Sequence, residues 1–362
     1  MRAAFYGLTF ALLLPACDMP ENKKTGHDAC ATCCLPVDET GWLDLGVVIR
    51  PGNPGVWDAR LGGMINPAAV IKKNDTYFLY YIGADGNRST DGGPRFRSLG
   101  VAISQDGLTY TKYEKNPVIV FRPNGNEEEG IFSAAAILDD RNRVHLYYAA
   151  CDAGSPVSVN VTCDIRLAIS EDGYSFNDVG VVLSHNDSRV WGYGDELFPV
   201  GVIQSFGRTY LYYIAKGHGD EAGIASYWHK FLVSLGARGN AFWDMGVAWG
   251  RDGEGYLSST SRYIRAGDEG FIIGGGDIHV LGEDYVRQII VRGFDNVSVE
   301  VRRSLRQNVS TPGQICRRYS FGNLSNATAF MDEDGGERTL FLYYLNESQD
   351  AIGILQSPSC GF

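Results

Sequence analysis

Acidic and aromatic residues gather in three short segments that each precede an apolar run. The segments read V-W-D-A-R-L-G-G-M-I-N-P from Val56, N-E-E-E-G-I-F-S from Asn126 and R-V-W-G-Y-G-D-E-L-F-P from Arg189. Hydrolysis of a glycosidic bond needs one carboxyl group to protonate the leaving oxygen and a second to activate water or attack the sugar, while flat rings stack on the sugar. The candidate residues for this chemistry are Trp57, Asp58, Arg60, Asn66, Glu129, Trp191, Tyr193, Asp195 and Glu196.

Crowding of carboxylates favours such a role, because a nearby like charge raises a carboxyl pKa towards the range of a general acid. A second interpretation stays open, since acidic residues are also common in solvated turns. It applies most to the run Glu127, Glu128 and Glu129, and least to Glu196 with its aromatic neighbours.

The elements that must position these residues are short strands. The stretch from Asn66 to Tyr110 contains three apolar-alternating runs separated by turn residues, which predicts a β-meander. Its signature, Y-F-L-Y-Y and then L-G-V-A-I-S-Q-D-G-L-T-Y, returns as V-H-L-Y-Y with I-R-L-A-I-S-E-D-G-Y-S-F, as T-Y-L-Y-Y, and as L-F-L-Y-Y. A degenerate fourth copy is expected over residues 258–291. Five copies predict an all-β, five-bladed β-propeller.

A second repeated string predicts how the ring closes. F-N-D-V-G-V-V ends the second copy and F-W-D-M-G-V-A ends the third, and W-L-D-L-G-V-V stands at Trp42, before the first copy. The last copy has only three strands. We therefore expect the N-terminal strand to complete the C-terminal blade, which removes two exposed sheet edges. The Y-Y pairs alternate between the faces of a strand, so we expect them to pack between blades.

This combination of motifs resembles the five-bladed propeller glycosidases of the arabinanase, levansucrase and invertase superfamily, especially glycoside hydrolase families 43 and 32. The motifs are V-W-D-x-R, N-P-x-x-V, Y-F-L-Y-Y-x-G-x-D and L-G-V-A-I-S-x-D-G-L-T-Y, and the resemblance extends from about Trp42 to the C-terminus. A glycosidase of this kind would use Glu196 as general acid and Glu129 or Asp195 as modulating carboxylates. Either Asp58 has taken over the role of base or nucleophile from the preceding loop, or the catalytic pair is incomplete. Trp57, Arg60, Asn66, Trp191 and Tyr193 are expected to bind the substrate.

The sequence departs from the family pattern at each catalytic position. The D-P step of the first blade reads Asn66-Pro67, the matching strand of the second begins Ser133-Ala134, and Glu196 stands one place further from Pro199 than in the family. Two functions follow. One is a secreted glycosidase acting on a plant or algal poly- or oligosaccharide. The other is a carbohydrate-binding propeller without catalysis, because the amide of Asn66 cannot take up a proton.

The N-terminus has the layout of an export signal. We expect residues 1–16 to form a signal peptide, with an apolar run that is followed by Pro15-Ala16-Cys17. Residues 17–40 are then a cysteine-containing segment, and residues 41–362 are the expected propeller domain. Nine N-x-S/T sequons favour a secreted glycoprotein. The alternative is a bacterial lipoprotein anchored at Cys17.

The eight cysteines are consistent with export. Cys151 and Cys163 flank an insert in the second copy, and Cys316 and Cys360 flank the last copy, so each pair is a candidate disulfide. Cys30, Cys33 and Cys34 lie near Cys17, where either oxidised pairing or a zinc site would fit.

Composition limits the partners. A net charge of −11 disfavours nucleic acid and anionic membranes, and no apolar run is long enough to span a membrane. No phosphate-binding loop, dinucleotide fingerprint or metalloprotease motif occurs, so we expect no cofactor and no catalytic metal. The oligomeric state stays open.

Overall fold

The structure is a computed structural model in which the described part of the chain contains strands and no α-helix. The described residues include no helix that could cross a membrane. The structure describes residues 41–53, 56–59, 65–85, 95–120, 130–152, 162–186, 196–205, 208–216, 243–250, 258–264, 272–274, 278–281, 285–292, 296–305, 314–322, 324–334, 337–346, 348–357 and 360–361.

The largest sheet has eight strands in two halves. The first half contains β2 (Ile65–Lys73), β3 (Thr76–Asp85), β4 (Arg95–Ser104) and β5 (Thr111–Lys112). The second contains β6 (Gly130–Leu138), β7 (Val144–Asp152), β8 (Thr162–Ser170) and β9 (Asn177–Leu183). Within each half the strands pair with their chain neighbours in antiparallel fashion. Among the described strands, the backbones of the two halves pair at one place, where Arg97 in β4 lies parallel to Gly130 in β6.

Three further sheets contain the other described strands. One consists of β10 (Leu197–Ser205), β11 (Arg208–Lys216), β12 (Trp243–Gly250) and β13 (Ser258–Ile264). The next consists of β14 (Ile272–Gly274), β15 (Ile278–Leu281), β16 (Tyr285–Arg292), β17 (Asn296–Leu305) and β18 (Gln314–Gly322). The last consists of β19 (Ser325–Asp334), β20 (Glu337–Asn346), β21 (Ala351–Gln356), β22 (Cys360–Gly361) and β1 (Leu43–Ile49).

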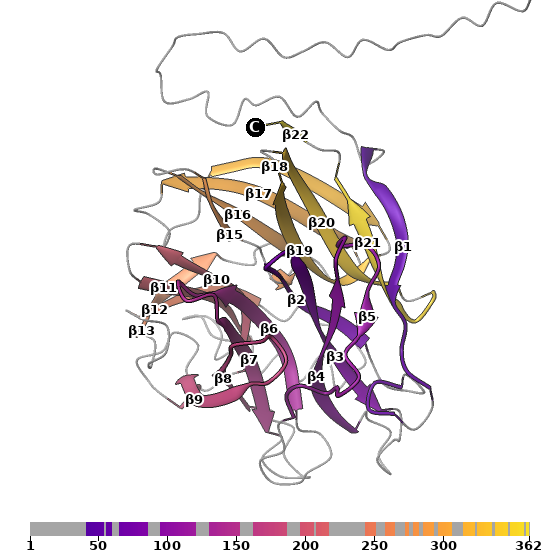
Figure 1. Ribbon diagram of the computed structural model, residues 1–362. Helices are drawn as coiled ribbons and strands as arrows, with labels where there is room; N and C mark the ends of the chain where they lie inside the picture. The colour runs from indigo at the N-terminus through magenta and orange to yellow at the C-terminus, as the bar shows by residue number, and fades with distance from the viewer. Residues whose placement is uncertain are drawn as a thin grey trace, which may run out of the picture.

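Figure 1 shows these sheets arranged about a common centre, near which β2, β6, β10 and β19 lie. The prediction that the N-terminal strand joins the last sheet is confirmed, since β1 pairs with β21 from Leu43–Gln356 to Ile49–Ile352. The number of blades stays a prediction.

The expected fourth copy is wrong in its boundary. Residues 258–264 pair with β12 and form the outer strand of the sheet that begins with β10. The reason is chemical: S-S-T-S-R-Y-I is a polar sequence suited to a sheet edge, whereas the inner strands are rich in small and apolar residues. The next sheet therefore begins at β14.

The Y-Y pairs hold neighbouring sheets together, as predicted. Tyr80 packs in a buried cluster with Tyr148 between the two halves of the largest sheet, while Tyr81 packs with Tyr343 in a cluster shared with β19–β21. Tyr147 faces the other way, into the cluster formed with β10 and β11. Because successive residues of a strand point to opposite faces, each pair contributes one ring to each neighbouring interface.

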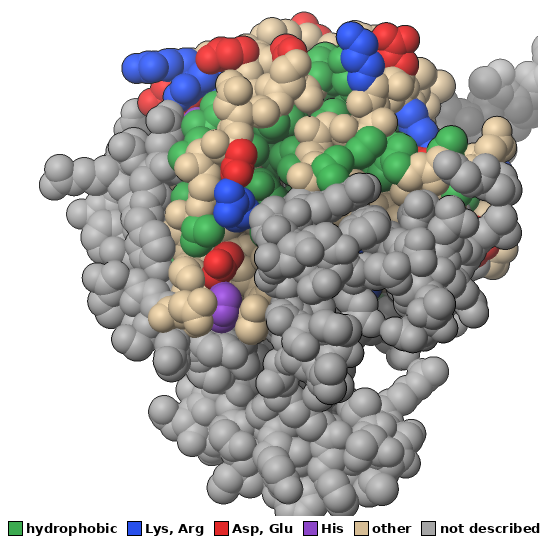
Figure 2. All heavy atoms as spheres, turned by 90° about the horizontal axis from the view of Figure 1, so that it is seen from below, with side chains coloured by type: hydrophobic (Ala, Val, Ile, Leu, Met, Phe, Trp, Pro, Cys, Tyr) green, Lys and Arg blue, Asp and Glu red, His purple; other side chains and the backbone are tan. Residues whose placement is uncertain are grey.

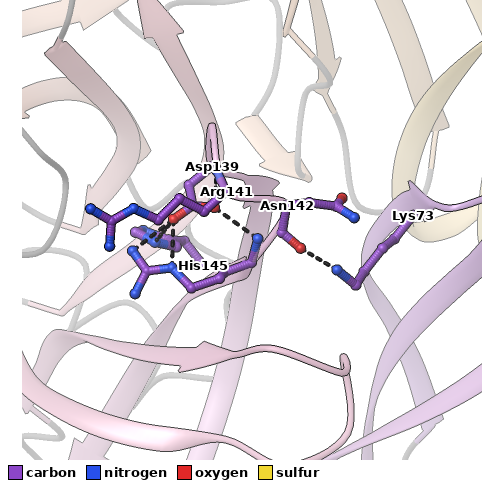
Figure 3. A network of polar contacts seen from close by, with 6 residues as sticks. Lys73, Asp139, Arg141, Asn142 and His145 are labelled. Carbon is purple, nitrogen blue, oxygen red and sulfur yellow. Dashed lines mark hydrogen bonds and ion pairs between the residues drawn. The ribbon is translucent and has the colours of Figure 1, made fainter.

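Two consecutive lysines at the end of β2 also point to opposite faces of the strand. The Lys72 ammonium group contacts Asp332 of β19 at 3.0 Å, whereas Lys73 donates a hydrogen bond to the carbonyl oxygen of Asn142. Figure 3 shows Lys73 pointing to this turn between β6 and β7, beside the carboxylate of Asp139. His145 Nε2 lies 3.2 Å from that carboxylate. The end of the β2–β3 hairpin therefore has polar contacts both with β19 and with the turn between β6 and β7.

The repeated A-I-S-x-D-G motif is a capped turn. Ser170 donates to Asp172 at 2.8 Å, and the Asp172 carboxylate accepts the amides of Tyr174 and Ser175 at 2.8 and 2.7 Å. Asp106 accepts the corresponding bonds in the first copy. Each aspartate thus organises the turn that follows its strand.

The described surface is chemically mixed. Seen from below relative to Figure 1, apolar side chains gather between separate basic and acidic groups (Figure 2). The exposed apolar residues include Val179 and Val181 of β9 and Leu43 of β1. They lie on outer strands, whereas the inner strands are buried.

Docking of β1 is testable through its one buried end. Ile49 is 3% exposed and packs in the cluster shared with β2 and β20, whereas Leu43 is 58% exposed. We expect Ile49→Ala to lower the free energy of unfolding by about 2–4 kcal/mol and Leu43→Ala by less than about 0.5 kcal/mol. Denaturant unfolding measures both; equal losses would contradict the docking of β1 on β21.

The aspartate turn predicts a pH dependence. Partial burial alone would raise the pKa of Asp172, but the amides of Ser175 and Tyr174 and the hydroxyl of Ser170 lower it to about 2. The stabilisation is therefore complete above the unfolded pKa of about 3.9 and is lost as the pH falls towards 2. We expect the difference in unfolding free energy between the parent and Asp172→Asn to shrink over this range. Asp75→Asn, on an exposed turn, is the control; a difference for Asp172→Asn that stays constant with pH would contradict this role.

Candidate functional site

The strands that line a small central cavity are the inner strands of the fold. The volume of the cavity is about 30 Å³, and it is lined by residues 68–70 of β2, 134–136 of β6, 200–202 of β10 and 328–329 of β19. These are mostly alanine, valine and glycine. The cavity has room for roughly one or two water molecules, so it cannot hold a sugar ring. A ligand as large as a sugar ring could reach these strands only where they begin or end.

The four inner strands each carry a bulge near the end at which they begin. There the pairing with the next strand shifts register, and the shifts fall at Pro67/Ala69, Ile131/Ala134, Pro199/Gly201 and Ser325/Thr328. Bulges re-aim side chains and are common beside active sites. The recurrence of the bulge in four strands makes this end the candidate site.

Two polar side chains at these bulges have no described hydrogen-bond partner. Asn66 is 8% exposed and its Oδ1 is buried and unpaired, and Ser133 Oγ is likewise buried and unpaired. Buried polar atoms are normally satisfied, so such atoms call for a water molecule or a ligand. Asn66 and Ser133 stand at the two positions where the sequence departs from the family's aspartates.

Glu196 lies at the same end, directly before β10. A row of backbone pairs connects it to the first half of the largest sheet: Arg97 pairs with Gly130, Gly130 with Cys151, Cys151 with Cys163, and Cys163 with Glu196. The Cys151–Cys163 disulfide, predicted from the insert between these residues, is present at the centre of this row. The row therefore fixes Glu196 relative to Arg97 across three groups of strands.

Gly130 permits the closest step of this row. Its φ is +150°, and a Cβ atom there would lie 2.5 Å from the carbonyl oxygen and 2.7 Å from the nitrogen of Arg97. Only glycine combines this backbone conformation with such a close approach.

Arg97 projects into the same region. Its guanidinium carbon lies 3.7 Å from the ring centroid of Phe132, whose ring lies 6.3 Å from that of Phe198. Burial lowers the pKa of Arg97 to about 10, and attraction by Glu196 partly opposes that shift. The group remains a cation at neutral pH.

Asp58 occupies a different environment. It is 3% exposed, and its Oδ2 accepts from Lys112 Nζ at 2.5 Å and from the Tyr81 hydroxyl at 3.1 Å. The ring of Trp57 packs against that of Tyr81 in a tilted arrangement, with the ring centroids 5.5 Å apart. These partners belong to β3, which pairs with the inner strand β2, and to β5 at the edge of the first half-sheet.

Other predictions lie outside the described residues. They concern Arg60, Glu129, Trp191, Tyr193 and Asp195, together with Cys17, Cys30, Cys33 and Cys34. The described residues contain no group of three potential metal ligands. The pairing of Cys316 with Cys360 also stays a prediction, because their side chains are not described.

Arg97 and Phe132 are site residues that the sequence did not indicate, and Ser133 had no predicted role. Arg97 follows a glycine-rich insert, and its contact with Phe132 depends on a pairing between separate repeats. Ser133 could have been identified from the sequence, because it stands at the start of the second inner strand.

Comparison with known proteins supports the fold. The chain matches no protein-family model, and a search of curated proteins finds no relative. Among solved structures, a thermostable family-43 glycoside hydrolase is similar with a TM-score of 0.53 and 13% identity, covering 84% of this chain and 90% of that chain. A family 117 glycoside hydrolase from the marine bacterium Zobellia galactanivorans is similar with a TM-score of 0.57 and 15% identity, covering 88% and 91%.

A third similar structure differs in its described activity. It is an N-acetylgalactosamine deacetylase from F. plautii in complex with blood group B trisaccharide, with a TM-score of 0.54 and 11% identity, covering 86% of this chain and 96% of that chain. At these identities the likeness shows the fold alone. The chain therefore shares its fold with these solved structures, and its chemistry must be argued from its own residues.

The close approach at Gly130 yields a prediction. We expect Gly130→Ala to lower the free energy of unfolding by roughly 1–3 kcal/mol, because it adds a clash with Arg97 to an unfavourable φ. Gly180→Ala is a matched control, since Gly180 has a φ of +116° but no atom within 4 Å of the position that a Cβ atom would take. Chemical denaturation compares the two; equal losses would show that the approach to Arg97 contributes nothing.

Proposed function

We propose that this chain is an exported glycoside hydrolase that acts on a plant or algal poly- or oligosaccharide, with a five-bladed ring of sheets and a site at the bulged ends of its inner strands. The observation that carries the proposal is the pair of unpartnered atoms, Asn66 Oδ1 and Ser133 Oγ, at the end that also holds Glu196. Sugar hydroxyls can donate to both atoms. The similar glycoside hydrolase structures support the same class.

Glu196 is the proposed general acid. It lies directly before an inner strand, and its backbone pairs with that of Cys163. Its carboxylate attracts the Arg97 guanidinium electrostatically. A positioned carboxylic acid can protonate the glycosidic oxygen as the bond breaks. Glu129 and Asp195 directly precede Gly130 and Glu196 in the sequence, and they remain the predicted accompanying carboxylates.

The predicted role of Asp58 as base or nucleophile has less support. Two donors already occupy its Oδ2, and 3% exposure leaves it little access to water or substrate. Lys112 is itself partly buried, so the pair contributes to the packing of β5 on β3. We propose that Asp58 is structural.

The second candidate function is carbohydrate binding without hydrolysis. It is favoured by the residue types at the bulges, because an amide at Asn66 and a hydroxyl at Ser133 can hold a sugar but cannot act as the family's carboxylates do.

The role of Glu196 is tested by a hydrolysis screen with aryl glycosides and plant and algal polysaccharides. We expect the parent to release sugar and Glu196→Gln to lose about 10²–10⁴-fold in kcat, because a positioned acid contributes that factor. Glu171→Gln, on an exposed turn, should retain activity. Full activity of Glu196→Gln would remove it from the mechanism, and glycan binding without any release of sugar would favour the second candidate function.

Asp58 is tested on stability as well as on rate. We expect Asp58→Asn to lower the free energy of unfolding by about 1–3 kcal/mol, because Lys112 loses its partner. The double variant Asp58→Asn/Lys112→Met should recover part of the loss. A fall of 10²-fold or more in kcat at unchanged stability would instead return Asp58 to the catalytic pair.

A further inference from the structure

Arg97 is an arginine with no matching partner in the described part of the chain. Its guanidinium forms no described hydrogen bond and no ion pair within 4 Å; its described contacts are the Phe132 ring and a longer-range attraction to Glu196. A guanidinium carries five N–H donors in one plane. Arg97 is only partly buried, so these donors remain open to a ligand at the candidate site.

The geometry favours an anion in the plane of the guanidinium. The guanidinium carbon lies over the Phe132 ring, 3.7 Å from its centroid, so the ring packs against the group while its N–H donors can still form hydrogen bonds. A carboxylate or a sulfate can accept two parallel N–H bonds from such an edge. Ser133 follows Phe132 in the same bulge and has an unpaired Oγ, so an acceptor for a sugar hydroxyl is adjacent in the chain.

Glu196 lies near Arg97. The two residues attract each other electrostatically. The row through Gly130, Cys151 and Cys163 holds both backbones in place. An anionic substituent bound to Arg97 would therefore lie close to the proposed acid.

We propose that Arg97 binds the acidic group, a carboxylate or a sulfate ester, of a charged sugar unit next to the bond that is cleaved. This inference rests on the proposed function, which it narrows from saccharides in general to acidic saccharides. The net charge of −11 repels anions at long range, so the selectivity arises locally. It should persist at 0.15 M salt, where charges beyond about 8 Å are screened.

The experiment measures binding as well as hydrolysis. The probes are glucuronic acid, galacturonic acid and galactose 6-sulfate, with glucose, galactose and the methyl ester of galacturonic acid as uncharged counterparts. Titration calorimetry at 0.15 M salt compares the parent with Arg97→Gln, Arg97→Lys and the control Arg141→Gln, which alters an exposed arginine. Unfolding curves verify that each variant is folded.

We expect at least one acidic probe to bind the parent about tenfold or more tightly than its uncharged counterpart. Arg97→Gln should abolish this preference, Arg97→Lys should retain part of it, and Arg141→Gln should retain all of it. Comparison of the uronates with galactose 6-sulfate shows whether Arg97 prefers a carboxylate or a sulfate ester. If Arg97→Gln does not fold, Arg97→Lys and the ester pair still test the preference.

The outcomes separate this inference from the proposed function. Hydrolysis or binding of uncharged sugars without any preference for acidic ones would overturn the role of Arg97 and leave the glycosidase proposal intact. A preference for acidic sugars without hydrolysis of any glycoside would support Arg97 and contradict the glycosidase. Absence of binding to every probe would overturn the anion site.

Discussion

The contact between Gly130 and the backbone of Arg97 is the constraint on which the candidate site depends. A glycine with a φ of +150° lets β6 approach β4 closely enough to pair with it, and this pairing starts the row that ends at Glu196. Without it the described contacts between the two halves of the largest sheet would be side-chain packing and side-chain hydrogen bonds, such as that of Lys73 to the Asn142 carbonyl oxygen. The disulfide at the centre of the row then transmits the position of one half-sheet to the residue proposed as the acid. A site formed by separate repeats thus acquires a continuous backbone connection.

Local periodicity predicted much of the fold. The Y-Y pairs, the aspartate turns, the strand at Trp42 and the Cys151–Cys163 bridge all involve residues whose partners follow from alternation or from short spacing. The sequence could not predict that residues 258–264 belong to the sheet of β10, because a polar edge strand can pair with whichever sheet lies beside it. Nor could it predict the contact of Asp58 with Lys112, 54 positions away, which requires β5 to pair with β4.

The residues at the bulges differ from those of the resembling glycosidases, so the chemistry of those enzymes cannot be assigned directly to this chain. The same fold appears in similar structures described as glycoside hydrolases and as a deacetylase, so architecture does not decide the reaction. At the corresponding strand ends this chain has an amide, a hydroxyl and one glutamate. That set is suited to holding sugar hydroxyls and donating one proton. Arg97, which has no ion-pair partner among the described residues, adds a preference for charge.

The central claim is that a sugar binds at the bulged ends of β2 and β6. The most direct measurement is a crystal structure of Glu196→Gln, in which hydrolysis is expected to be slow, with a bound oligosaccharide. The account predicts sugar hydroxyls within about 3.2 Å of Asn66 Oδ1 and Ser133 Oγ. A sugar bound elsewhere on the molecule, with ordered water or nothing at those two atoms, would contradict it.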